Sequence, residues 1–207
     1  MEDPAAEKNV NEENQTTAKR PGEDAPMRGF WAETLRFTFI AALIILPIRF
    51  FVAQPFVVSG DSMVPTFEDG EYLIVDEISY RFQKPARGDV VIFRYPRDRK
   101  KFFIKRIIGL PGETVAMVND RILITAQSGA TKELDEPYTR QKRDDRLTVK
   151  LKDGEYFVLG DNRAASSDSR VWGTLPAGNI VGRPIVRLFP ISRLDLLPGR
   201  YVFSSSK

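Results

Sequence analysis

The chain of 207 residues contains no cysteine and no histidine. Without cysteine it can form no disulfide framework, no thiol nucleophile and no thiolate metal site. Without histidine, neither a Ser-His-Asp triad nor an H-E-x-x-H zinc site can form. Hydrolytic chemistry would therefore rest on Ser, Thr, Lys, Tyr, Asp or Glu, and we expect no metal and no cofactor. The net charge of +3 is small and both signs are spread along the chain, which argues against a nucleic-acid partner.

The N-terminal part of the chain divides into a polar and an apolar segment. Residues 1–29 are polar and carry three prolines, so we expect a disordered tail. From Phe37 to Val58, Arg49 is the only charge in 22 residues. A helix of that length reaches about 33 Å, against a hydrocarbon core of roughly 30 Å. We predict a single transmembrane helix over residues 30–54; a cleaved signal peptide and a buried soluble helix are the alternatives.

Flanking charge predicts the orientation of this helix. Residues 17–36 contain four Lys or Arg residues, whereas residues 59–78 contain none. The positive-inside rule therefore places the N-terminal tail in the cytoplasm and the part after the helix on the outer side of the membrane.

After residue 60 the pattern changes to short runs rich in β-branched residues, bounded by Gly or Pro, with no sustained helical periodicity. Asn119 and Asp120 suit a two-residue hairpin turn. We predict a mainly β protein, in which the helix is followed by an all-β, barrel-like or sandwich-like domain over residues 55–207. Residues 126–146 are charged and are expected to form a surface insertion. Strands are expected at 72–78, 89–93, 102–108, 114–118, 121–124, 147–151, 155–159 and 180–188.

A lysine is the most available base for a serine when histidine is absent. An ordinary lysine has a pKa near 10.4, so only about one in 2,500 is neutral at pH 7, and burial among apolar groups lowers that pKa. In the strand 102–108 side chains alternate, which places Lys105 on one face with Phe103 and Ile107. An edge-strand lysine that prevents aggregation is the alternative interpretation.

Two further stretches are rich in hydroxyl groups. Ser62 lies in a short polar turn after the apolar segment, where it is either a nucleophile or only a turn residue. Gly160 to Gly173 contains serines and opposite charges after a predicted strand. It is either a rigid polar loop that supports a site or a hydrogen-bonded surface turn.

Taken together, three motifs in this order resemble bacterial type I signal peptidases over residues 30–190. They are Ser62-Met-Val-Pro-Thr66, Lys105-Arg-Ile-Ile-Gly-Leu-Pro-Gly112, and Gly160-Asp-Asn-Arg163 with the Ser166–Gly173 stretch. The resemblance implies a serine endopeptidase with a Ser-Lys dyad on the outer face of the bacterial cytoplasmic membrane. It also implies cleavage of signal peptides from exported preproteins after small residues, in an Ala-x-Ala pattern. The implied partners are preprotein signal peptides, membrane lipid and, by proximity, the secretion translocon.

The resemblance also implies a role for individual positions. Ser62 is the expected nucleophile and Lys105 the expected general base. The other implied positions are Ser166, which orients the lysine; the ionic pair Asp168 and Arg170; and Phe56, Val58 and Ile104, which line shallow pockets for small substrate side chains.

One position departs from part of the family. Some members carry a serine whose hydroxyl helps to form the oxyanion hole, and this chain has Gly60 there. The oxyanion would then depend on backbone N–H groups, chiefly that of Ser62. Two other functions are left open: a Ser-Lys peptidase with one dedicated substrate, and an inactive membrane-anchored β domain that acts as a binding module.

Overall fold

The computed structural model describes residues 27–47, 53–139 and 144–203, so the predicted tail up to residue 26 lies outside the described residues. The chain separates into two units, one up to Leu43 and one from Ile44 onward. The first described element is the helix α1 (Met27–Pro47). Its large apolar side chains are exposed, among them Leu35, Phe37 and Leu43. Within the described ranges, no helix is both long enough and apolar enough to cross a membrane.

The predicted boundary between helix and β domain is corrected by the first strand. Residues 53 and 54, which we assigned to the membrane helix, belong to β1 (Ala53–Val57). They pair with Asp76 and Val75 of β2 (Tyr72–Asp76), so their backbone hydrogen bonds go to a sheet and not to a helix. At its other end the helix includes residues 27–29, which were assigned to the tail.

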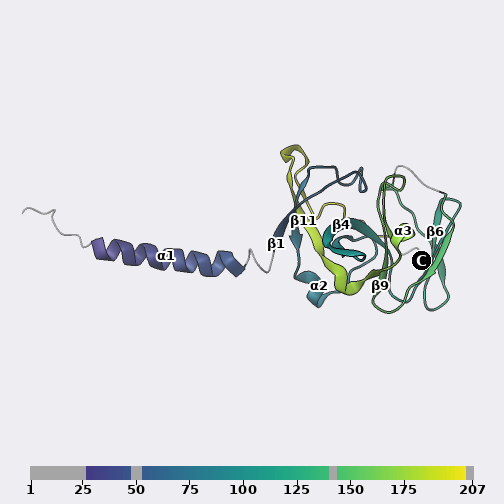
Figure 1. Cartoon of the computed structure of the whole chain (residues 1–207), viewed down its shortest axis with the longest axis horizontal. Helices are drawn as coiled ribbons and strands as arrows, with labels where there is room; N and C mark the ends of the chain where they lie inside the picture. The colour runs from purple at the N-terminus through teal and green to yellow at the C-terminus, as the bar shows by residue number, and fades with distance from the viewer. Residues whose placement is uncertain (1–26, 48–52, 140–143, 204–207) are drawn as a thin grey trace, which may run out of the picture. The chain divides into compact units, whose positions relative to one another are not determined.

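The strands of the described residues form two antiparallel sheets (Figure 1). The larger sheet has the order β1-β2-β11-β3-β4-β9-β10, and β12 pairs with β11. The remaining bounds in this sheet are β3 Val90–Tyr95, β4 Asp98–Gly109, β9 Glu155–Leu159, β10 Leu175–Pro176, β11 Ile180–Phe189 and β12 Asp195–Leu196. Short helical turns lie between them: α2 Ser79–Phe82, α3 Ser169–Trp172, η2 Ala177–Asn179 and η3 Ile191–Arg193.

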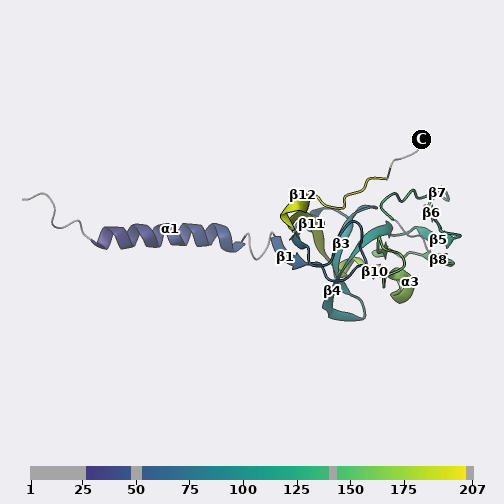
Figure 2. The same ribbon diagram turned by 90° about the horizontal axis from the view of Figure 1, so that it is seen from above.

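The smaller sheet has the order β7-β6-β5-β8. Its strands gather at one end of the β domain, whereas β1 and β12 lie at the other (Figure 2). Their bounds are β5 Thr114–Val118, β6 Arg121–Thr125, β7 Thr131–Glu133 and β8 Leu147–Lys150. Asn119 and Asp120 join β5 to β6 with φ angles of 49° and 63°. The positive φ values confirm the predicted two-residue hairpin turn.

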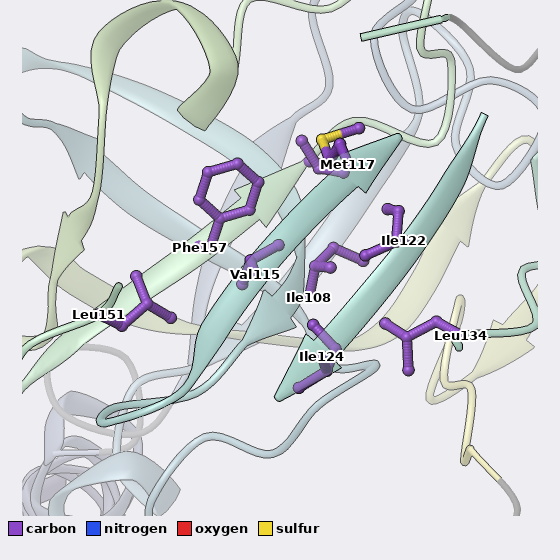
Figure 3. Packing of buried hydrophobic residues seen from close by; sticks show 9 residues of the cluster. Ile108, Val115, Met117, Ile122, Ile124, Leu134, Leu151 and Phe157 are labelled. Carbon is purple, nitrogen blue, oxygen red and sulfur yellow. The ribbon is translucent and has the colours of Figure 1, made fainter. Parts of the chain in front are cut away.

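The core between the two sheets uses residues from both. Ile108 of β4 and Phe157 of β9 pack against Val115 of β5 and Ile122 of β6 (Figure 3). Leu134, which follows β7, belongs to the same cluster and is 7% exposed. The segment predicted as a surface insertion therefore contributes an edge strand and a core side chain to the second sheet.

Candidate active site

Ser62 and Lys105 lie in contact. Ser62 follows β1 in a polar turn, and Lys105 lies in the middle of β4, where it pairs with Val91 of β3. The Lys105 Nζ atom is 2.7 Å from Ser62 Oγ and donates a second hydrogen bond to the Ile104 carbonyl at 2.8 Å. The structure thus brings together two residues that are 43 positions apart in the chain.

The alternation of β4 explains the burial of Lys105. Phe103 and Ile107, on the same face of the strand, pack into a core cluster, and Lys105 itself is 4% exposed. Its Nζ lies 5.5 Å from the centre of the Phe103 ring. Burial lowers the pKa of Lys105 to about 8, even though the negative charges of Asp168 and Asp161 act to raise it. About a tenth of this amine is therefore neutral at pH 7, far more than for an ordinary lysine.

An apolar groove runs beside this pair. It has a cavity volume of about 290 Å³, and its lining includes Phe56, Val58 and Ile104 together with Ser62 and Lys105. These three apolar residues come from the end of β1 and from β4. The groove therefore contains every residue for which the resemblance implied substrate contact.

Gly60 lies at the groove with a φ of +85°, a conformation that favours glycine. Its N–H donates to Asp69 Oδ1 at 2.7 Å. That hydrogen bond fixes the turn that leads to Ser62, and it occupies the Gly60 N–H.

The loop after β9 contacts the serine turn directly. The Asn162 N–H donates to the Ser62 carbonyl at 3.0 Å, and the Asn162 side chain donates to the Asp61 carbonyl at 3.1 Å. A Cβ atom on Gly160 would lie 2.4 Å from the Ser62 carbonyl oxygen and 2.2 Å from Ser166 Oγ. Glycine at position 160 is what permits this close approach.

A buried ion pair beneath the serine turn was not predicted. Arg106 donates to Asp161 through Nε at 2.9 Å and Nη2 at 2.6 Å, and both side chains are at most 1% exposed. Asp161 also accepts a hydrogen bond from Thr66 Oγ1 at 2.5 Å. The signal in the sequence was an arginine on an apolar face of β4, next to Lys105, with no partner nearby in the chain.

The remaining candidate residues lie in the 160–170 loop. Arg170 donates to both carboxylate oxygens of Asp168 at 2.8 Å, and Asp168 also accepts from the Gly160 N–H at 3.1 Å. Burial alone would raise the pKa of Asp168, but the hydrogen bonds and charge of Arg170 hold that pKa below its usual value. Ser166 Oγ is buried and makes no hydrogen bond to Lys105, but it lies near enough to the Asp168 carboxylate to help to lower the pKa of Asp168.

A serine hydroxyl in contact with a buried lysine amine, beside an apolar groove, is the arrangement of a serine hydrolase that works without histidine. Comparison with known proteins agrees with this class. The family described as signal peptidase, peptidase S26, matches residues 31–189. The chain belongs to this family, and it is a serine endopeptidase.

Individual relatives cover most of the chain. A probable signal peptidase I-1 of Synechocystis is 38% identical over 192 residues, which are 87% of this chain and 95% of the relative. A signal peptidase I of Leptolyngbya laminosa is 39% identical over 88% of this chain and 90% of the relative. A crystal structure of a signal peptidase I from Enterococcus faecalis is 32% identical, covers 49% of this chain and 97% of that chain, and has a TM-score of 0.42.

Proposed function

We propose that this chain cleaves signal peptides from exported preproteins, with Ser62 as the nucleophile and Lys105 as the general base. The observation that carries the proposal is the 2.7 Å contact between Ser62 Oγ and the buried Lys105 Nζ. When the amine is neutral, the same contact lets the Ser62 hydroxyl donate its proton to Nζ.

The reaction follows from this proton transfer. Ser62 Oγ attacks the carbonyl carbon of the scissile bond, and the Ser62 N–H stabilises the resulting oxyanion. The Gly60 N–H is held by Asp69, so it is not the second donor of this oxyanion hole. The Lys105 ammonium then protonates the leaving amine, and a water molecule deprotonated by Lys105 hydrolyses the acyl-enzyme.

We assign the supporting residues as follows. Asp168 and Arg170 stabilise the loop that carries Ser166, through the bidentate pair and the bond to Gly160. Ser166 orients Lys105 once its side chain turns from the Asp168 carboxylate toward Nζ.

The groove supports a preference for small substrate side chains. Phe56, Val58 and Ile104 offer an apolar surface without a charged group. Within the described sheet β1 pairs only with β2, so its other edge can accept an extended peptide as an added strand. Such a peptide would pass Ser62 with its side chains alternating toward the groove, in keeping with Ala-x-Ala cleavage.

We further propose that α1 and the apolar residues after it anchor the chain in the bacterial cytoplasmic membrane. The helix exposes apolar side chains such as Phe37, Phe39 and Leu43, which water solvates poorly. With the basic residues on the cytoplasmic side, the β domain would lie on the outer face. There it would contact lipid and meet preproteins near the translocon.

The test is cleavage of a preprotein by the full chain in detergent, with sequencing of the new N-terminus. We expect cleavage after the Ala-x-Ala site, and loss of cleavage in Ser62→Ala and in Lys105→Ala. Full activity of Lys105→Ala would refute the proposed base. Activity on one preprotein among many would favour a peptidase with a dedicated substrate, and no turnover of any preprotein would favour a binding module.

A further inference from the structure

A carboxylate from the second sheet reaches the loop that contacts the serine turn. Glu136, three residues after β7, accepts hydrogen bonds from Arg163 Nη1 at 2.9 Å and Nη2 at 2.5 Å. Both side chains are 4% exposed. Tyr138 OH donates to the same carboxylate at 2.8 Å. Because a buried carboxylate is costly unless paired, this contact is a defined feature of the fold and not a surface ion pair.

Arg163 connects Glu136 to the backbone of Ser62. The Arg163 Nε donates to the Gly160 carbonyl at 3.0 Å. Gly160 contacts the Ser62 carbonyl closely, and the Asn162 N–H donates to that carbonyl. Within the described residues, the hydrogen bonds of the Arg163 guanidinium go only to Glu136 and Gly160. Glu136 is therefore the carboxylate that holds the Arg163 side chain, while Arg170 Nη2 donates to the Arg163 carbonyl at 2.8 Å.

The same segment supports the turn by a second route. The Tyr138 ring covers the Arg106 guanidinium at 4.0 Å. Arg106 binds Asp161, which accepts the Thr66 hydroxyl four residues after Ser62. Both routes run from residues 136–138 to the turn at 62–66.

We propose that Glu136 is a positioning residue, which holds the 160–163 loop against the serine turn and so sets the Ser62 Oγ–Lys105 Nζ contact. The inference rests on the proposed function of these two residues. Through Glu136, the segment after β7 thereby acts on the active site, although the strands of the second sheet do not line the groove. Buried ion pairs add little net stability but fix geometry, which suits such a role.

The test compares Glu136→Gln with the matched control Glu133→Gln. Glu133 lies in the same segment, but its ion pair with Arg121 is exposed, and Arg121 Nε is 3.6 Å from Glu133 Oε1. We expect Glu136→Gln to lower kcat roughly tenfold to a hundredfold, because a displacement near 1 Å has effects of this size. KM should change by less than about twofold, because Phe56 and Ile104, which line the groove, lie on β1 and β4 and not on the 160–163 loop. Glu133→Gln should keep both constants.

Two further variants and a count of active sites separate positioning from folding. Rates are divided by the number of sites that a serine-acylating probe labels, so an unfolded fraction does not lower kcat. Glu136→Asp, which keeps the charge, should recover part of the lost kcat. The double variant Glu136→Leu with Arg163→Met removes both buried charges, so it should fold and still show the low kcat.

The outcomes are distinct. Wild-type kcat per labelled site in Glu136→Gln or in the double variant would overturn the positioning role. Equal losses in Glu136→Gln and Glu133→Gln would also overturn it. Ser62→Ala is measured in the same series: if it retains activity, the proposed function fails, whatever the Glu136 variants show.

Discussion

The pKa of Lys105 leads to a quantitative prediction for the pH dependence of cleavage. Burial in β4 lowers this pKa to about 8. The neutral amine is the active form of the proposed base, so the rate should rise as pH rises and level off above the pKa. At pH 7 about a tenth of the amine is neutral, and at pH 9 about nine tenths.

The expected rise between pH 7 and pH 9 is therefore roughly tenfold, followed by a plateau. An ordinary lysine with a pKa near 10.4 would give a rise of about a hundredfold over the same interval, with no plateau before pH 10. The contrast of tenfold and a hundredfold is large enough to decide between a buried and a solvated amine.

The assay is single-turnover cleavage of a preprotein from pH 6 to pH 10, with enzyme in excess so that product release does not limit the rate. Melting temperatures at each pH show that the enzyme stays folded. A midpoint near 10, or a flat profile under single-turnover conditions, would refute the assignment of neutral Lys105 as the base.

Three other variants test the energetics of the site. Lys105→Met should abolish cleavage, yet it should raise the free energy of unfolding at pH 7 by up to about 3 kcal/mol, because the native state disfavours the ammonium form of Lys105 below pH 8. In denaturant titrations this gain in stability should vanish as pH rises from 8 to above 10.5. Arg106→Met should cost about 3–5 kcal/mol in the same titrations, since it leaves Asp161 buried without its cation. Gly160→Ala should lower kcat roughly tenfold or more by displacing Ser62, whereas Gly178→Ala, with nothing within 4 Å of the added Cβ, should not.

Local patterns were sufficient for most of the fold. The strand at 114–118 and the turn at Asn119–Asp120 follow from period-two patterning and turn chemistry, which are local properties. The strand expected over 72–78 ends at Asp76 because this carboxylate accepts the N–H groups of Ile78 and Ser79 and starts α2. The strand β7 was not predicted, since its three residues are exposed and carry no alternation.

The candidate site likewise combines features that local patterns predict with features that they do not. The place of Lys105 among apolar side chains was predicted because strand alternation is readable in one segment. The ion pairs of Arg106 and Glu136 were not predicted, because the partner of each is distant in the chain: Arg106 and Asp161 are 55 positions apart, and Glu136 and Arg163 are 27 apart. A sequence shows that a charge lies on an apolar face or in a polar segment, but the partner that permits its burial emerges only when the sheets are assembled.

The most direct test of the central claim locates the acyl group. The full chain is mixed with excess preprotein at pH 9, where Lys105 is largely neutral, quenched with acid within the first turnover, digested, and analysed by mass spectrometry. We predict an acyl adduct on the peptide that contains Ser62, and no adduct there in Lys105→Ala. An adduct on another residue, or one that forms as fast in Lys105→Ala as in the unmodified chain, would contradict the assignment of Ser62 and Lys105.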